Sequence, residues 1–341
     1  MEKAGVKVLV TGGVGFIGSN LVDALLEAGH TVTIYDNLSL LPTEEERQQR
    51  IKAEEERGVR VVRANLLDEG RIDEAAQGQD VVFHLAAQKY VDESLKDPIN
   101  STKQNVVGLV TLLHSAVRHK VKKVFLASSA AVYGYNDNFP LKESETPDPR
   151  SPYALEKVVG EQYLKLFYNL HALDSASLRF FNVYGPKQYS KQTHCGGVTI
   201  VMHQLKEHGV AEILGDGSQT RDMVYVGDVV AAMMQAMLHP HPLRGEIFNV
   251  CTNTRVTVKF LQESIAEVMG LSTSGGGGGS SDEPQLRFKS LPFAEGNVVH
   301  SQGDNQKAKD TFGFEATTSL QEGLQKTWTW FQQNPSFYSS S

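Results

Sequence analysis

The amino-acid sequence predicts an α/β protein built on a doubly wound parallel sheet, with a smaller α/β domain at its C-terminal end. Two observations predict this fold class. Over the first half of the 341-residue chain, strand-like apolar runs alternate with stretches of helical spacing, and a glycine-rich turn follows the first run. Such alternation implies parallel strands covered by helices on both faces, because each parallel connection needs a crossover.

The individual elements are predicted from the spacing of apolar residues. Short apolar runs predict strands over residues 6–10, 31–35, 59–64, 80–86, 122–127 and 247–250. Helical spacing predicts helices over residues 16–28, 99–118, 152–170, 198–208, 229–238 and 256–269. The highly charged stretch 43–58 predicts a further helix that faces solvent.

The domain organisation is predicted from the loss of regular alternation after about residue 183. We expect a first domain over residues 1–182, with a returning segment at about 227–253. The smaller C-terminal domain then combines residues 183–226 with residues 254–341. Five consecutive glycines at 275–279 predict a flexible loop over residues 272–283, because glycine is costly to order and brings no side chain to pack.

Composition excludes several classes of protein. The formal charge is −7 and no basic cluster stands out, which disfavours a nucleic-acid surface. No apolar run approaches the roughly 20 residues of a membrane helix, and the start has no apolar signal region, so we expect a cytoplasmic protein. Two cysteines, Cys195 and Cys251, are too few for a disulfide framework or a metal site.

The glycine-rich turn predicts a dinucleotide site. Gly12, Gly15 and Gly18 follow a predicted strand and open a predicted helix, the context that a phosphate-binding turn requires. The first glycines let the backbone approach a pyrophosphate, and Gly18 lets the helix pack closely on the sheet. The phosphates would lie at the helix N-terminus, so the first domain is predicted to be Rossmann-like.

Asp36 predicts which dinucleotide binds. It ends the second predicted strand, 18 residues after Gly18, where a carboxylate accepts hydrogen bonds from the ribose hydroxyls. It would repel a 2′-phosphate, and no arginine lies within several residues on either side. NAD is therefore favoured over NADP.

A tyrosine and a lysine predict the chemistry. Tyr153 and Lys157 lie four residues apart on one face of a helix that Ser151 would cap. An ammonium group stabilises a phenolate, so we expect it to lower the tyrosine pKa toward working pH. A hydroxyl from Ser129 or Ser128, after another predicted strand, could bridge substrate and tyrosine. These parts favour hydride transfer with a tyrosine acid/base.

Together these segments resemble the extended short-chain dehydrogenase/reductase family over nearly the whole chain, and are most similar to its UDP-glucose and UDP-N-acetylglucosamine 4-epimerases. The resemblance is carried by TGGVGFIG (11–18), HLAA (84–87), SSAAVYG (128–134), YALEK (153–157), RFFNVYGP (179–186) and GDGSQTRDMVYV (215–226). It implies that Ser129, Tyr153 and Lys157 are catalytic, with Ser129 preferred over Ser128.

The resemblance also implies the binding residues. Its cofactor positions fall on Gly12, Gly15, Phe16, Ile17, Gly18, Asp36, Asn37, Asn65, Leu66, Ala86, Ala87, Lys89, Asn105, Tyr153, Lys157 and Phe180. Its substrate positions fall on Lys89, Ser129, Tyr153, Asn182, Val198, Arg221 and Ser301. The family pattern usually has aspartate where this chain has Asn65.

The activity implied by the resemblance is interconversion of UDP-sugars at C4 through transient oxidation by bound NAD. The family usually forms homodimers, here through helices at about 99–118 and 152–170. Another nucleotide-sugar enzyme (a uronate 4-epimerase, a 4-reductase or a dehydratase) is an alternative, as is an inactive nucleotide-binding scaffold. Ala130 and Ala131 stand where dehydratases carry acid and carboxylate side chains, which disfavours dehydration.

Two positions bear on the substrate. The family often carries R-x-G-D where residues 294–297 of this chain begin with Ala294, so one arginine for the diphosphate is missing. Ser301 aligns with the position whose size admits or rejects N-acetyl sugars, and a small residue there implies that both UDP-hexoses and their N-acetyl forms are accepted.

Overall fold

The computed structural model describes residues 5–188, 197–272, 286–291 and 299–335 of the chain. The glycines at 275–279, residues 294–297 and Cys195 lie outside these residues, so the loop and the missing arginine remain predictions from the sequence. No helix among the described residues is long and apolar enough to cross a membrane.

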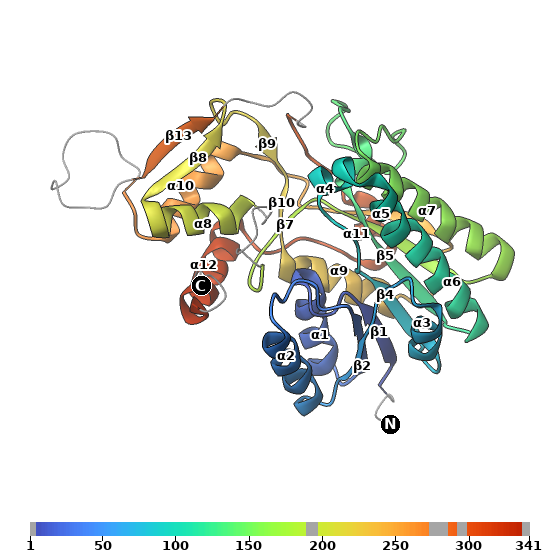
Figure 1. Cartoon of the computed structure of the whole chain (residues 1–341). Helices are drawn as coiled ribbons and strands as arrows, with labels where there is room; N and C mark the ends of the chain where they lie inside the picture. Colours follow the sequence, from blue (N-terminus) through green and yellow to red (C-terminus); the bar gives the residue numbers. More distant parts are fainter. Residues whose placement is uncertain (1–4, 189–196, 273–285, 292–298, 336–341) are drawn as a thin grey trace.

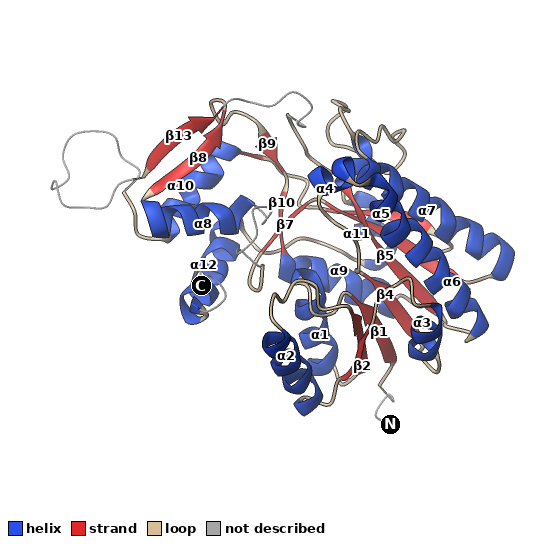
Figure 2. Cartoon of the chain, in the orientation of Figure 1, coloured by secondary structure: helices blue, strands red, loops and turns tan. Residues whose placement is uncertain are grey.

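A seven-stranded parallel sheet forms the larger part of the molecule (Figures 1 and 2). Its strand order is β11-β6-β5-β4-β1-β2-β3, and every neighbouring pair is parallel. The strands are β1 (Lys7–Thr11), β2 (Thr31–Asp36), β3 (Arg60–Arg63), β4 (Val81–His84), β5 (Lys123–Ser129), β6 (Asp174–Phe180) and β11 (Glu246–Val250). The predicted Rossmann-like fold class is confirmed, and the bounds of the predicted strands lie within two residues of the observed ones, although β6 was not predicted.

Helices cover both faces of this sheet because its strands are apolar on both sides. Val8 and Val10 of β1 pack in one apolar cluster with α1 (Phe16–Glu27) and α9 (Val226–Leu238). Leu9, which points to the opposite face, packs in a second cluster with α3 (Glu69–Ala76), α6 (Gly108–Arg118) and α7 (Pro152–His171). The charged helix α2 (Glu44–Glu56) packs against β3 at the edge of the sheet, and Thr43 caps its N-terminus.

The predicted helix over residues 99–118 is divided into three pieces. It consists of α5 (Pro98–Thr102), a π-helical turn η1 (Lys103–Val107) and α6. The short helix α4 (Val91–Lys96) precedes it, and a 3₁₀ turn η2 (Ala130–Tyr133) follows β5. A π turn widens a helix locally and is frequently found at functional sites.

The C-terminal unit lies at the upper left of Figure 1 and is also α/β. Its core joins α8 (Gly197–His208), α10 (Val258–Val268) and α12 (Leu320–Gln333). Three pairs of short strands complete it: β7 (Asn182–Tyr184) with β10 (Met223–Tyr225), β8 (Val210–Leu214) with β13 (Arg287–Leu291), and β9 (Thr220–Arg221) with β12 (Val256–Thr257).

A late segment of the chain packs against the edge of the large sheet. Helix α11 (Gln306–Phe312) belongs to the segment predicted for the second domain, but it packs against β11 at the edge of the large sheet. Phe312 contacts Phe248 with ring centroids 5.1 Å apart, and Phe314 is fully buried in the first cluster. This edge strand would otherwise expose apolar side chains, so the late segment returns to cover it.

Candidate functional site

The glycine turn joins β1 to α1 and is formed by close backbone contacts. Gly12 has a φ of +73°, and a Cβ there would lie 2.7 Å from the Ala86 nitrogen of the segment after β4. A Cβ on Gly18 would lie 2.2 Å from the Gly12 carbonyl oxygen. Glycine is therefore required at both positions, which leaves the N-terminus of α1 open to a phosphate.

Asp36 lies at the end of β2, beside this turn. Its carboxylate accepts hydrogen bonds from the backbone N–H groups of Val14 at 3.0 Å and Leu38 at 2.8 Å. Burial raises the pKa of Asp36, and these two bonds together with the nearby charge of Arg50 oppose that rise. The sequence shows no arginine close to Asp36 in the chain, but α2 brings Arg50 into its electrostatic environment.

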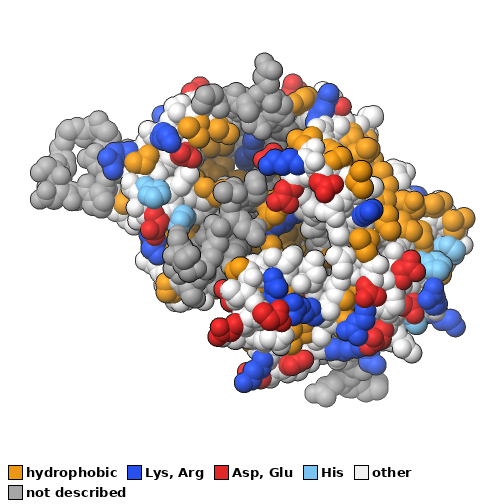
Figure 3. Space-filling model, in the orientation of Figure 1, with side chains coloured by type: hydrophobic (Ala, Val, Ile, Leu, Met, Phe, Trp, Pro, Cys, Tyr) orange, Lys and Arg blue, Asp and Glu red, His pale blue; other side chains and the backbone are white. Residues whose placement is uncertain are grey.

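A cavity of about 400 Å³ opens in front of the turn, and Figure 3 shows the molecule hollowed on this side. Eleven of the residues predicted to bind the cofactor line it: Gly12, Gly15, Phe16, Ile17, Gly18, Asp36, Asn37, Leu66, Ala86, Ala87 and Lys89. They come from the start of α1 and from the segments at the carboxyl ends of β1, β2, β3 and β4, which the strand order brings side by side.

Other predicted cofactor residues lie outside the lining of this cavity. The carbonyl of Asn65 accepts a hydrogen bond from the hydroxyl of Tyr35 at 2.7 Å, and Tyr35 itself lines the cavity. Phe180 is buried in the apolar cluster at the end of β6. Asn105 is buried, and its side-chain amide forms hydrogen bonds with the backbone N–H and carbonyl of Gln88, which lines the cavity.

Ser129, Tyr153 and Lys157 come together where β5 ends and α7 begins. The Ser129 hydroxyl acts on Tyr153 in the direction that favours the phenolate by lowering its pKa, and Ser129 Oγ accepts a hydrogen bond from the Ala131 backbone N–H at 3.2 Å. Lys157 Nζ lies 5.5 Å from the centre of the Tyr153 ring and donates to the Ala127 carbonyl at 2.8 Å. Ser151 caps the helix, as predicted from its sequence.

The protonation of this group differs in part from the expectation. Burial raises the pKa of Tyr153, and the nearby Ser129 hydroxyl opposes that rise without reversing it. Burial lowers the pKa of Lys157 to about 8, while the carboxylates of Glu156 and Glu161 act in the opposite direction. The predicted lowering of the tyrosine pKa is therefore absent, because burial disfavours the phenolate more strongly.

Ser128, the alternative hydroxyl, has a different partner. Its Oγ donates to Glu161 Oε1 at 2.6 Å, and this carboxylate also receives two bonds from Arg179. Arg179 and Glu161 are both 1% exposed. Ser128 thus belongs to a buried ion-pair network, whereas Ser129 is the serine whose hydroxyl acts on the pKa of Tyr153.

Three of the residues predicted for the substrate, Asn182, Arg221 and Ser301, lie where the two units meet. Asn182 Nδ2 donates to the Asp222 carbonyl at 3.1 Å and to Ser301 Oγ at 3.2 Å, so three distant segments converge. Arg221 Nη1 donates to the carbonyls of Thr220 and Val299, and burial lowers the arginine pKa. The side chain of Val198, another residue predicted for the substrate, is fully buried in the C-terminal core.

The family follows from comparison with known proteins. Residues 8–251 match the NAD dependent epimerase/dehydratase family. The chain belongs to this family. It is 37% identical over 329 residues to the UDP-glucose 4-epimerase of Mycolicibacterium smegmatis, a match that covers 96% of this chain and 98% of the relative.

Two solved structures of this family are also similar. One is the UDP-N-acetylglucosamine 4-epimerase of Methanobrevibacter ruminantium in complex with UDP-N-acetylmuramic acid, with a TM-score of 0.85, 32% identity, and coverage of 97% of this chain and 100% of that chain. The other is the UDP-glucose 4-epimerase of Thermus thermophilus in complex with NAD, with a TM-score of 0.81, 30% identity, and coverage of 96% and 99%.

The residues of this epimerase/dehydratase chain fit the dinucleotide that the family uses. A Cβ on Gly15 would lie 3.1 Å from the Gly12 oxygen, which is closer than an ordinary contact, so glycine at this position leaves the backbone of the turn open to a diphosphate. Asp36 keeps both oxygens beside the cavity, each with one backbone donor and with further lone pairs available. Among the described residues, no group of three or more His, Cys, Asp or Glu side chains could hold a metal ion.

Several lining residues were not predicted from the sequence. These are Tyr35, Ser39, Leu40, Ala64, Leu85, Gln88, Tyr90, Glu93, Asn100, Gln104 and Ala127. Tyr35, Ala64 and Ala127 lie at or just beyond the carboxyl ends of predicted strands, and ligands bind at this edge of parallel sheets. That rule could have found them, whereas Asn100 and Gln104 arrive from helices and needed the tertiary structure.

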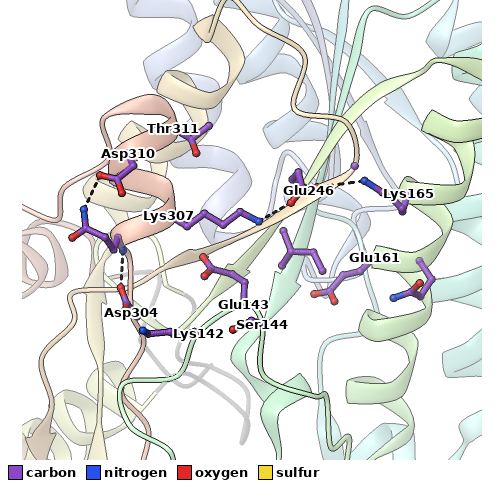
Figure 4. Close-up of a pocket in the computed structure, with 14 residues that line it drawn as sticks. Lys142, Glu143, Ser144, Glu161, Lys165, Glu246, Asp304, Lys307, Asp310 and Thr311 are labelled. Atoms are coloured by element: carbon purple, nitrogen blue, oxygen red, sulfur yellow. Dashed lines mark hydrogen bonds and ion pairs between the residues drawn. The ribbon is translucent and has the colours of Figure 1, made fainter.

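A second cavity, of about 730 Å³, lies beside β11 and is shown in Figure 4. Glu246 lies between two lysines there, 3.3 Å from Lys165 Nζ and 2.8 Å from Lys307 Nζ. Glu143 accepts the Asn249 backbone N–H at 2.7 Å, and burial raises the pKa of Glu143. These bonds join α7, β11 and α11, and the lining contains none of the residues predicted for the site.

Proposed function

We propose that this chain is a nucleotide-sugar 4-epimerase that acts on UDP-glucose and UDP-galactose, on their N-acetyl forms, or on both, with NAD held as a bound catalyst. The observation that carries the proposal is the Ser129–Tyr153–Lys157 group beside a cavity that fits a dinucleotide. The M. smegmatis and T. thermophilus relatives, both UDP-glucose 4-epimerases, support the choice of reaction.

The proposed mechanism assigns each of these residues a step. Gly12, Gly15 and the start of α1 hold the diphosphate of NAD, and Asp36 holds its ribose. When bound, NAD supplies a site that takes the C4 hydride and returns it. Tyr153 takes the proton of the sugar 4-hydroxyl as hydride leaves C4, and gives a proton back when hydride returns to the opposite face of the 4-keto sugar.

The neighbours of Tyr153 make this proton transfer possible. The Lys157 ammonium stabilises the phenolate, and Ser129 orients the phenol and the 4-hydroxyl. Because burial raises the pKa of Tyr153, the phenol keeps its proton until substrate and cofactor change its surroundings; it then loses that proton to solvent, and the phenolate accepts the proton of the 4-hydroxyl. Asn182 and Arg221 hold the substrate diphosphate while the sugar turns, which contributes positioning.

The test is incubation of the purified protein with UDP-glucose, UDP-galactose, their N-acetyl forms and a UDP-uronate, followed by product analysis without added cofactor. Appearance of the 4-epimer supports the proposal. A 4-keto product, a decarboxylated product or net consumption of NAD(P)H would assign another activity of the family. Binding of nucleotide without turnover would favour the scaffold alternative.

Tyr153→Phe tests the mechanism. Because the variant removes the hydroxyl that carries the proton, we expect turnover to fall about 10²–10⁴-fold with the cofactor still bound. Tyr135→Phe is the matched control, since Tyr135 is 42% exposed and lies outside the site. Near-normal turnover of Tyr153→Phe removes this residue from the mechanism.

We also propose a homodimer through the helices predicted for this contact. Leu155, Leu166 and Leu170 of α7 are 52%, 45% and 65% exposed, and Ile99 of α5 is 70% exposed. Figure 3 shows apolar side chains gathered over this side of the molecule. Leu166→Glu should convert a dimer to a monomer in analytical ultracentrifugation, while Leu238→Glu on α9, 63% exposed in the native chain, should not.

A further inference from the structure

A buried carboxylate lies between two catalytic residues on α7. Glu156 is 4% exposed, although it is charged and directly precedes Lys157. Its oxygens accept hydrogen bonds from Ser101 Oγ at 2.8 Å, Thr102 Oγ1 at 3.1 Å and Asn105 Nδ2 at 2.6 Å. A buried carboxylate is tolerated only when it is well bonded, and these three donors satisfy that requirement.

The donors belong to a different part of the fold. Ser101 and Thr102 end α5, and Asn105 lies in the π turn η1. Glu156 therefore joins α7, which carries the tyrosine and lysine, to the helix that runs beside the cofactor cavity. Asn100 and Gln104 of the same stretch line that cavity.

Asn105 extends the connection to the cavity wall. Its Nδ2 group donates to the Gln88 carbonyl at 2.8 Å as well as to Glu156, and its Oδ1 accepts the Gln88 backbone N–H at 2.8 Å. Both backbone groups of Gln88 are thus held by one buried amide. Gln88 lies within the segment 85–90, which follows β4 and lines the cavity along its whole length.

We infer that Glu156 is a positioning residue: it orients the Asn105 amide so that the segment 85–90 keeps the shape that receives the cofactor. The inference rests on the proposed function, because it takes this cavity to be the NAD site. Without the carboxylate, nothing at this position accepts the second proton of Asn105 Nδ2, and the amide is free to turn away from Gln88.

The charge of Glu156 has a second consequence for the same site. Glu156 directly precedes Lys157 in the chain, and its charge acts on the lysine through space. Burial lowers the pKa of Lys157, and Glu156 and Glu161 oppose this effect. Glu156 thereby favours the charged lysine that the proposed mechanism uses.

The experiment compares two substitutions at this position. Glu156→Gln keeps an oxygen acceptor for Asn105, whereas Glu156→Leu fills a similar space without one and leaves Asn105 Nδ2 without this acceptor. We expect Glu156→Leu to weaken NAD binding to the cofactor-stripped chain about tenfold or more, the scale of one lost bond to a charged group. Glu156→Gln should bind NAD within about threefold of the native chain, and so should the control Gln162→Ala on the exposed face of α7.

Amide hydrogen exchange of the cofactor-free native chain gives a readout that needs no variant. The Gln88 N–H should be protected, because it is bonded to a buried side chain, and the protection should fall in Glu156→Leu. Free exchange of Gln88 in the native chain overturns the inference, and so does native NAD affinity in Glu156→Leu. Failure of the native chain to bind NAD would instead refute the proposed function.

Discussion

His84 provides a quantitative test through the pH dependence of stability. It is 3% exposed in β4, and its Nδ1 lies 2.8 Å from Thr11 Oγ1. Thr11 Oγ1 also accepts the backbone N–H of Ala86 at 3.3 Å, so His84 supports the segment that lines the cofactor cavity. Burial lowers the pKa of His84 from 6.5 to about 3, and the nearby charge of Lys157 acts in the same direction.

The sign of the effect follows from which state binds the proton. In the unfolded chain this histidine is protonated below about pH 6.5, whereas in the folded chain it stays neutral down to about pH 3. The neutral buried His84 therefore contributes stability that is fully present above pH 6.5 and is lost as the pH falls toward 3. At about 1.4 kcal/mol per pH unit, the loss between pH 6.5 and pH 5 is about 2 kcal/mol.

The assay is urea unfolding at pH 7, 6 and 5, for the native chain and for His84→Asn. The variant keeps a polar group near Thr11 but does not titrate, so its stability should fall about 2 kcal/mol less over this range. His208→Asn, at an exposed position on α8, is the control and should follow the native chain. Equal pH dependence in the native chain and His84→Asn would refute the reasoning.

Three further predictions concern the site and its support. Asp36→Ala should lower the ratio of NAD to NADP affinity in titrations, because the carboxylate that would repel a 2′-phosphate is gone; an unchanged ratio contradicts its role. Glu161→Gln should cost about 3–5 kcal/mol in urea unfolding, since it leaves the charge of Arg179 buried and uncompensated; a cost under about 1 kcal/mol would show that the pair is dispensable. Gly18→Ala should abolish cofactor retention, because its Cβ would lie 2.2 Å from the Gly12 oxygen, and retained cofactor would mean that the turn adapts.

The prediction of the cofactor site depended on local patterns that the fold preserved. The turn after β1, Asp36 at the end of β2 and the pair on α7 each occupy a strand end or a helix start. Apolar periodicity and glycine spacing report on such positions directly, because they reflect steric demands within a few residues of chain. The predicted lowering of the Tyr153 pKa was wrong, because burial raises this pKa and burial depends on segments that are far apart in the sequence.

The arrangement of the helices around the site was harder to predict. The stretch 99–118 has uninterrupted helical spacing, yet it contains the π turn that carries Asn105. Arg50 lies 14 positions after Asp36 and approaches it only because α2 packs against β3, the neighbour of β2 in the sheet. The contact of α11 with β11 joins residues about 60 positions apart, and no periodicity of either segment predicts it.

By itself the sequence determined the fold class, the family resemblance and the residue types for hydride transfer and proton transfer, because these depend on short-range spacing and on side-chain chemistry. Only the tertiary structure decided which of those residues meet. The sheet places β1 between β2 and β4, so Gly12 lies against Ala86. Helix α7 packs against η1, so Glu156 reaches Asn105. Burial in that arrangement also decided the direction of each pKa, since the cost of charge depends on everything packed around it.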